Sequence, residues 1–116
     1  MGSITGSAPD LLRGTVDLLI LRTLANGPLH GYAIAQRLRV VSEDVLQVGE
    51  SSLYPSLQRL LLKGWVSAEW GASENNRRAR FYSITAAGRK QLARETESWE
   101  RISGVIGRVL RLKPQE

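Results

Sequence analysis

The arginines of residues 77–80 are the side chains whose spacing most clearly indicates a chemistry. Arg77, Arg78 and Arg80 fall within four residues, directly after the polar run GASENN. Guanidinium groups bind phosphate well, because each presents a planar set of N–H donors to the phosphate oxygens. The cluster is also compatible with a solvated loop, and the residues alone leave both interpretations open.

A second basic surface is predicted on a helix over residues 51–64. Ser51 or Ser52 is the expected N-cap, since a serine hydroxyl can accept a hydrogen bond from an N–H of the first turn. With Ser52 as cap, Pro55 takes the third helical position, where its missing N–H costs nothing. Gly64 is expected to end the helix.

The two faces of this predicted helix differ in character. Its inward stripe consists of leucines, namely Leu53, Leu57, Leu60 and Leu61. Its outward face is polar and basic and consists of Ser52, Pro55, Ser56, Arg59 and Lys63. Small side chains near the start and cations further along suit a helix that enters a groove of nucleic acid.

The sequence offers no set of residues that could supply a nucleophile with an oriented base. The chain has no cysteine and a single histidine, His30, which we expect to serve a local hydrogen bond or packing. No P-loop, dinucleotide fingerprint, HExxH or G-x-S-x-G motif occurs, and GESSL at 49–53 does not have the final glycine of a nucleophile elbow. We therefore predict that the protein is not an enzyme and uses no cofactor or metal.

Length and composition indicate one small folded unit. The 116 residues are 42% hydrophobic and 23% charged, which is ordinary for a globular domain. Sixteen Lys+Arg against eleven Asp+Glu give a net charge of +5, and the isoelectric point is near 10.2. A small basic protein of this kind commonly binds a polyanion.

Hydrophobic periodicity and turn residues divide the chain into elements. Helices are predicted over residues 11–25, 31–41, 51–64 and 86–110, and strands over 65–70 and 79–84. Residues 42–49 are expected to form a loop with a short extended piece. Trp65 and Trp70 are expected to pack the hairpin against the helices. Residues 1–10, rich in Gly and Ser, are interpreted as a disordered arm or a remnant of cloning.

The last predicted helix is long for so small a domain. Capped by Thr85, it would extend about 38 Å. Its apolar residues include Leu92, Trp99, Ile102, Ile106, Val109 and Leu110. Its own domain offers little surface to cover this stripe, so we expect it to pair with a second copy of the chain. Gly104 and Gly107 either permit close helix approach or mark fraying.

This order of elements predicts a mainly α fold with a small β component. Three helices, a two-stranded hairpin and a long helix match a winged helix-turn-helix followed by a dimerisation helix. The expected organisation is a DNA-binding domain at 11–85 and a dimerisation helix at 86–112. In such a domain the third helix enters the major groove and the hairpin, or wing, touches the DNA backbone or minor groove.

Three segments of the chain resemble the PadR-like transcriptional regulators. These are GPLHGYAIAQRL (27–38), SSLYPSLQRLLLKGWV (51–66) and RARFYSITAAGRKQL (78–92). The likeness extends from 11 to 110 and matches the shorter branch of the family, which has one C-terminal helix. One departure is Leu61-Leu62-Lys63, where an acidic residue is common.

The resemblance implies roles for particular residues. Ser52, Tyr54, Pro55, Ser56 and Arg59 occupy the positions of a DNA-reading helix, with Lys63 as a phosphate contact and Arg77, Arg78 and Arg80 on the wing. Tyr54 is equally suited to packing. Trp99 matches a tryptophan that faces the cavity between two subunits, where it either stacks on planar ligands or belongs to the dimer core.

The resemblance also implies partners. It predicts a cytoplasmic homodimer that binds a pseudo-palindromic operator in double-stranded DNA and represses a nearby promoter. A small aromatic or drug-like effector would release the DNA. No apolar run approaches the ~20 residues needed to cross a bilayer, so no membrane association is expected. The alternative is a winged-helix module that binds proteins and not DNA.

Overall fold

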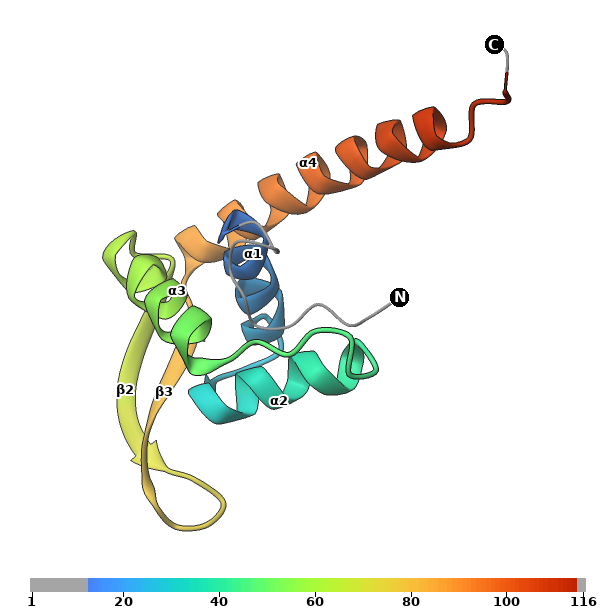
Figure 1. The fold of residues 1–116 in the computed structure, drawn as a ribbon. Coiled ribbons are helices and arrows are strands. Elements are labelled where there is room, and N and C mark those ends of the chain that lie inside the picture. The colour runs from blue at the N-terminus through green and yellow to red at the C-terminus, as the bar shows by residue number, and fades with distance from the viewer. Residues whose placement is uncertain (1–12, 115–116) are drawn as a thin grey trace.

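The structure is a computed structural model that describes residues 13–114, and it contains four helices and a small sheet within that range (Figure 1). The helices are α1 (Arg13–Leu24), α2 (Gly31–Val41), α3 (Glu50–Leu62) and α4 (Ala86–Leu110). The strands are β1 (Leu29–His30), β2 (Val66–Ala72) and β3 (Arg78–Ile84). The proposed arm at 1–10, and the first residues of the helix predicted from 11, lie outside the described range.

The core lies where α1, α2 and α3 meet the base of the hairpin. α1 provides its centre, because residues three and four apart lie on one helical face and are buried together. The buried apolar side chains of α1 are Val16, Ile20, Leu21 and Leu24. The other elements add Ile34, Leu38, Leu53, Leu57, Leu60, Val66 and Tyr82. The leucine stripe predicted for the third helix is therefore largely confirmed.

The start of α3 differs from the prediction. The N-cap is Gly49 and not a serine, and the Gly49 carbonyl accepts from the N–H groups of Ser52 and Leu53 at 3.1 and 2.9 Å. Because the helix begins at Glu50, Ser51 and Ser52 lie within its first turn and do not cap it. Pro55 lies inside the helix and not at its third position. The predicted end is confirmed, since Gly64 follows the last turn with a φ of +74°.

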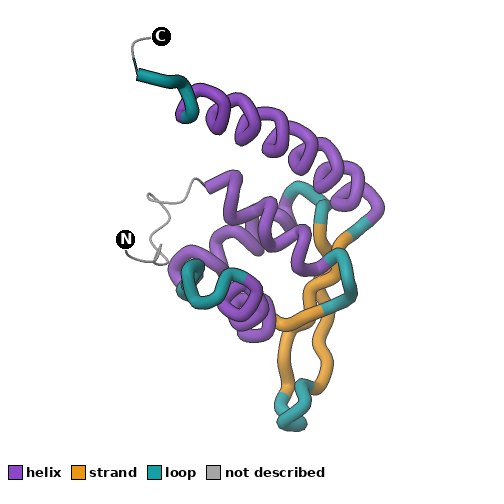
Figure 2. Tube along the Cα trace, turned by 90° about the vertical axis from the view of Figure 1, so that its right-hand side faces the viewer, coloured by secondary structure: helices purple, strands orange, loops and turns teal. Residues whose placement is uncertain are grey.

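The sheet has the strand order β1-β3-β2, and all pairings are antiparallel. The hairpin was predicted, but β1 was not, because two residues are too few to show an alternating pattern. A tight loop joins β2 to β3, in which the Ser73 N–H donates to the Arg77 carbonyl at 2.8 Å. Figure 2 shows the hairpin projecting beyond the helices, so its far half stands clear of the core.

α4 begins where the sequence predicts. The Thr85 hydroxyl accepts from the Gly88 N–H at 3.0 Å and donates to the Gly64 carbonyl at 2.7 Å, which fixes this helix to the end of α3. A β-carbon on Gly88 would lie only 2.0 Å from the Trp65 carbonyl oxygen, so only glycine allows this approach.

After its first turns α4 passes one end of α1 and leaves the domain (Figures 1 and 2). Leu92 still packs against the core. In the part of the chain that the structure describes, no helix combines the length and apolarity required to span a membrane.

Candidate nucleic-acid interface

The exposed face of α3 is rotated about the helix axis relative to the predicted face. Its exposed residues are Glu50, Ser51, Tyr54, Pro55, Gln58 and Leu62, with Lys63 at the C-cap. Of the predicted outward residues, Pro55 and Lys63 are exposed, whereas Ser52 and Ser56 are 7% and 1% exposed. Assigning Ser52 and Ser56 to the outer face was therefore wrong, and Ser51 and Gln58 were missed.

Arg59 also points inward and not toward solvent. Its Nη2 donates to Asp17 Oδ1 of α1 at 2.9 Å and to Ser56 Oγ at 2.7 Å, while its Nε donates to Asp17 Oδ2 at 3.3 Å. The side chains of Arg59 and Asp17 are 28% and 10% exposed. A guanidinium held by three hydrogen bonds ties α3 to α1, so the expected base-reading role does not fit its position.

One signal in the sequence could have revealed this pair. Asp17 lies on the same helical face as Leu21 and Leu24, both of which are buried. A carboxylate in such a stripe is costly to bury unless a cation or several hydrogen bonds meet it. A basic side chain such as Arg59 on a neighbouring helix is one such partner.

Tyr54 belongs both to the exposed surface and to the packing of the domain. Its side chain is 44% exposed, yet its ring covers Gly31, the first residue of α2. A β-carbon at position 31 would lie 2.9 Å from the Tyr54 hydroxyl oxygen and 3.1 Å from Cε1. The lack of a side chain at Gly31, in the HGY segment, therefore leaves the space that the ring of Tyr54, in the LYP segment, occupies.

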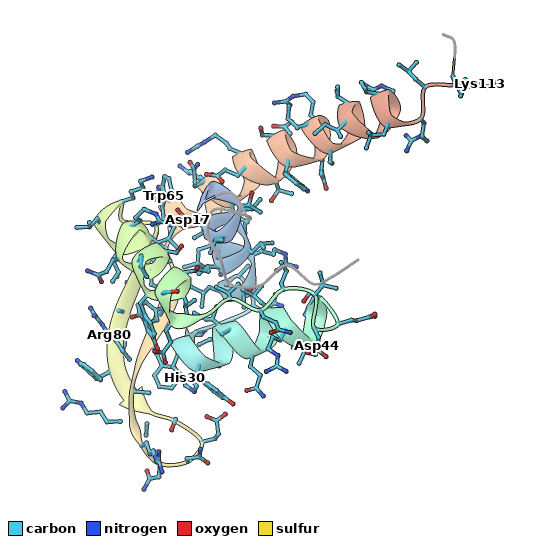
Figure 3. The ribbon with its side chains drawn as sticks, viewed as in Figure 1. Asp17, His30, Asp44, Trp65, Arg80 and Lys113 are labelled. Carbon is cyan, nitrogen blue, oxygen red and sulfur yellow. The ribbon has the colours of Figure 1, made fainter. Side chains whose placement is uncertain are left out.

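Two of the wing arginines, Arg78 and Arg80, lie on one face of the hairpin. Because side chains alternate along a strand, the register Trp70↔Arg80 and Ala72↔Arg78 places Trp70, Arg78 and Arg80 on the same side. The Arg78 guanidinium lies 4.3 Å from the centroid of the Trp70 ring, and that of Arg80 lies 5.9 Å from Tyr82. Figure 3 shows Arg80 on the side of the wing away from α2.

The structure corrects the role expected of one hairpin tryptophan. Trp65 packs against the core as predicted. Trp70 does not, because it lies on the part of β2 beyond the core and is 59% exposed. Its ring supports Arg78, and such an arrangement restricts an otherwise mobile cation.

The tip of the wing is attached to α2 through His30. The His30 Nδ1 accepts from the Ala33 N–H at 3.2 Å and caps α2, and its ring meets Phe81 edge-on at 5.3 Å. Its Nε2 lies 3.3 Å from Glu74 Oε1 in the tip. A backbone hydrogen bond and the contact with His30 lower the pKa of Glu74. The local role expected for His30 is confirmed.

The far half of α4 presents an unpartnered apolar face within the described chain. Five residues predicted there are 49% to 78% exposed, namely Trp99, Ile102, Ile106, Val109 and Leu110. Val105 and Leu112 extend this face. Leu92, also predicted to lie there, packs on its own domain and does not belong to this face.

A groove runs between α4 and the start of α1. It has a volume of about 370 Å³ and is lined by Gly14, Thr15, Leu18, Glu95, Ser98, Trp99 and Ile102. Trp99 therefore lies in a hollow as well as on the apolar face. Both interpretations of this residue, as part of a contact between subunits and as a stacking surface, agree with its position.

Comparison with known proteins identifies the group to which this arrangement belongs. The model of the transcriptional regulator PadR-like family matches residues 20–94. The chain belongs to the PadR-like family of transcriptional regulators.

Individual PadR-like and related proteins match over most of this chain. A transcriptional regulator from Clostridium thermocellum is 32% identical, with a TM-score of 0.77 over 85% of this chain and 96% of that one. A PadR-like regulator from Bacillus cereus is 25% identical, with a TM-score of 0.78 over 90% and 99%. A 37.1 kDa protein of transposon TN4556 from Streptomyces fradiae is 42% identical over 77% of this chain, which spans 24% of that protein.

PadR-like membership confirms the main expectations from the sequence. The fold is mainly helical with a small sheet and matches winged-helix regulators, and the protein is a transcription regulator and not an enzyme. It also places the α3 surface and the wing in a protein whose family binds DNA.

We predict that Arg59→Ala lowers the free energy of unfolding by about 2 to 3 kcal/mol, because the Asp17 carboxylate loses its partner in a poorly hydrated position. Urea unfolding followed by circular dichroism, at one fixed protein concentration, measures the change. Gln58→Ala is the matched control, because its exposed side chain should change stability by less than about 0.5 kcal/mol.

A double-mutant cycle separates this pair from general effects of truncation. In an Asp17→Ala background, Arg59→Ala should cost clearly less, because the carboxylate is already gone. Equal losses with and without Asp17 would contradict the assignment.

Proposed function

We propose that this protein is a homodimeric repressor that binds a pseudo-palindromic operator in double-stranded DNA. The observation that carries the proposal is the combination of an exposed polar face on α3 with an arginine-bearing wing beside it (Figure 1). In a winged helix-turn-helix these are the elements that meet the major groove and the DNA backbone. A regulator with this activity works beside the chromosome, in the cytoplasm.

Gln58 is the residue we assign to base reading. It is exposed near the middle of the outer face of α3, between Pro55 and Leu62. A glutamine amide can donate to N7 and accept from N6 of adenine at once, which gives direct discrimination. Ser51 and Pro55 add small contacts near the start of the helix, while Ser52, Ser56 and Arg59 support the helix from behind.

Phosphate contacts come from the two ends of this surface. Lys63 is exposed at the end of α3, with its Nζ 4.8 Å from the centroid of the Trp65 ring. The Tyr54 hydroxyl is at the start, over α2. On the wing, Arg77, Arg78 and Arg80 form no ion pair with any carboxylate of residues 13–114. These groups are available to neutralise DNA phosphates.

The exposed apolar face of α4 supports the dimer. Isolated apolar side chains are common on protein surfaces, but a continuous stripe along one helix indicates a contact. Two copies joined through this face would hold two α3 helices at a fixed separation. Half-sites about one helical turn apart are the operator geometry that such a pair requires.

The groove that contains Trp99 is the proposed effector site. An indole beside Leu18 and Ile102 offers a planar apolar surface for a small aromatic compound. A ligand held between α1 and α4 would alter the spacing of the two DNA-reading helices and so release the operator. No cofactor is needed for this cycle.

We predict that the protein selects a specific duplex from a random-sequence pool and that two variants affect this binding differently. Gln58→Ala should weaken binding to the selected duplex about tenfold and leave random DNA unchanged. Arg77→Ala should weaken both by a similar factor and reduce the salt slope by about one. Fluorescence anisotropy at two salt concentrations measures both effects.

The outcome also tests the alternative function. If the wild-type chain binds no duplex even at low salt, DNA binding is wrong and a protein-interaction module becomes the better assignment. If Gln58→Ala weakens random and selected DNA equally, the base-reading role of Gln58 is wrong.

Trp70→Leu should weaken binding to every duplex two- to fivefold, because an exposed cation–π contact of about 0.5 to 1 kcal/mol no longer orients Arg78. The salt slope should stay unchanged, since the guanidinium itself remains. Trp70→Phe keeps an aromatic face and should restore part of the loss. If Arg78→Ala weakens binding while Trp70→Leu does not, the orienting role of Trp70 is refuted.

Ile106→Glu should convert the dimer to a monomer in sedimentation velocity runs, because it places a charge in the apolar face of α4. Lys90→Glu introduces the same side chain at an exposed polar position of this helix and should leave the dimer intact. A wild-type protein that sediments as a monomer would overturn the proposed assembly.

A further inference from the structure

A hollow on the outer side of α1 and α2 is separate from every surface assigned above. Its volume is about 250 Å³. It is lined by Leu19, Arg22, Thr23, Asn26, Arg37, Leu38 and Val41. None of these residues belongs to the α3 face, the wing or the groove that contains Trp99.

The two arginines of this hollow have no acidic partner among residues 13–114. Of the carboxylates on these two helices and the following turn, Glu43 forms no ion pair with Arg22 or Arg37, and the other two have partners elsewhere. Asp17 pairs with Arg59, and Asp44 accepts from Arg39 Nε at 3.4 Å. Arg22 and Arg37 therefore give the hollow an uncompensated positive charge.

Polar and apolar groups are separated within the hollow. A second hollow of about 270 Å³ adjoins it and shares Thr23, Asn26 and Arg37, so these residues form the polar corner. The opposite part is aliphatic and consists of Leu19, Leu38 and Val41, of which Val41 is 69% exposed. Among the described residues, no aromatic side chain lines either hollow. A ligand that fits must carry an anionic head and a flexible aliphatic body.

We propose that this hollow binds a medium-chain alkyl carboxylate. The carboxylate lies between the guanidinium groups of Arg22 and Arg37, with the Asn26 amide as a further donor. The chain covers Leu19, Leu38 and Val41, which removes their apolar surface from water. An apolar cavity of about 150 Å³ accommodates benzene, so a volume of about 250 Å³ suits a chain of this class.

The groove beside Trp99 would not accept the same ligand. It contains Glu95, which repels a carboxylate, and none of the described residues that line it is an arginine or a lysine. The two hollows therefore differ in the charge of the ligand they favour. The carboxylate site also stands independently of DNA binding, because none of its residues lies on the proposed DNA surface.

The test is a titration of the full-length, isotope-labelled protein with octanoate, followed by amide chemical shifts. Shifts should concentrate at residues 19–26 and 37–41, with a Kd of about 0.1 to 1 mM. Octylamine and 1-octanol, which have the same chain and no anionic head, should bind at least about tenfold more weakly.

Two matched variants locate the head group. Arg37→Gln should weaken octanoate about tenfold or more and leave 1-octanol unchanged, because it removes a charged donor only. Arg39→Gln removes the same charge from the same helix outside the hollow and should have no effect. In titrations with duplex DNA, Arg37→Gln should show the same chemical-shift changes as the wild type, because this site is separate from the DNA surface.

Several results would overturn the proposal. These are no shifts up to about 10 mM octanoate, equal binding of octylamine, or equal weakening by Arg39→Gln. Shifts confined to the α4 groove would assign the ligand to the Trp99 site. If the shifts at residues 19–26 and 37–41 depend on protein concentration and not on octanoate, the hollow binds a second copy of the chain.

Discussion

The ion pair between Asp17 and Arg59 determines which side of α3 faces outward. A carboxylate that is 10% exposed must have a partner, and α3 is turned so that Arg59, which also donates to Ser56 Oγ, meets it. This rotation buries the serines on one side and presents Gln58 on the other. The chemistry of the proposed DNA-facing surface is thus a consequence of a charge buried on a different helix. α1, which provides that charge, also packs against α2 and α4 and is the common support of the domain.

Much of the architecture could be predicted from sequence, because local sequence patterns determine it. The hairpin, the Thr85 cap and the full extent of α4 follow from alternation, turn residues and helical spacing. The outward face of α3 could not be predicted from its leucines, because they spread over a wide arc that allows more than one rotation. Only the buried carboxylate of α1 resolves it, and that contact joins residues 42 positions apart. The position of Trp70 depends similarly on where the core ends.

The described arginines differ in whether a carboxylate is bound to them. Arg59 and Arg39 have defined carboxylate partners. The arginines on surfaces assigned to ligands do not, and on the wing Arg78 and Arg80 lie over aromatic rings. A ring restricts a guanidinium without neutralising it, so the cation stays free to attract an anion.

The contact between Gly31 and Tyr54 gives a residue outside the DNA-facing surface control over that surface. An alanine at position 31 would displace a tyrosine hydroxyl, the outer end of a rotatable side chain, and would leave the backbone in place. The fold would tolerate the exchange while the start of the reading helix acquired a different outline. If α3 reads the operator as proposed, operator preference can drift during evolution, or be adjusted by an engineer, through a residue that never touches a base.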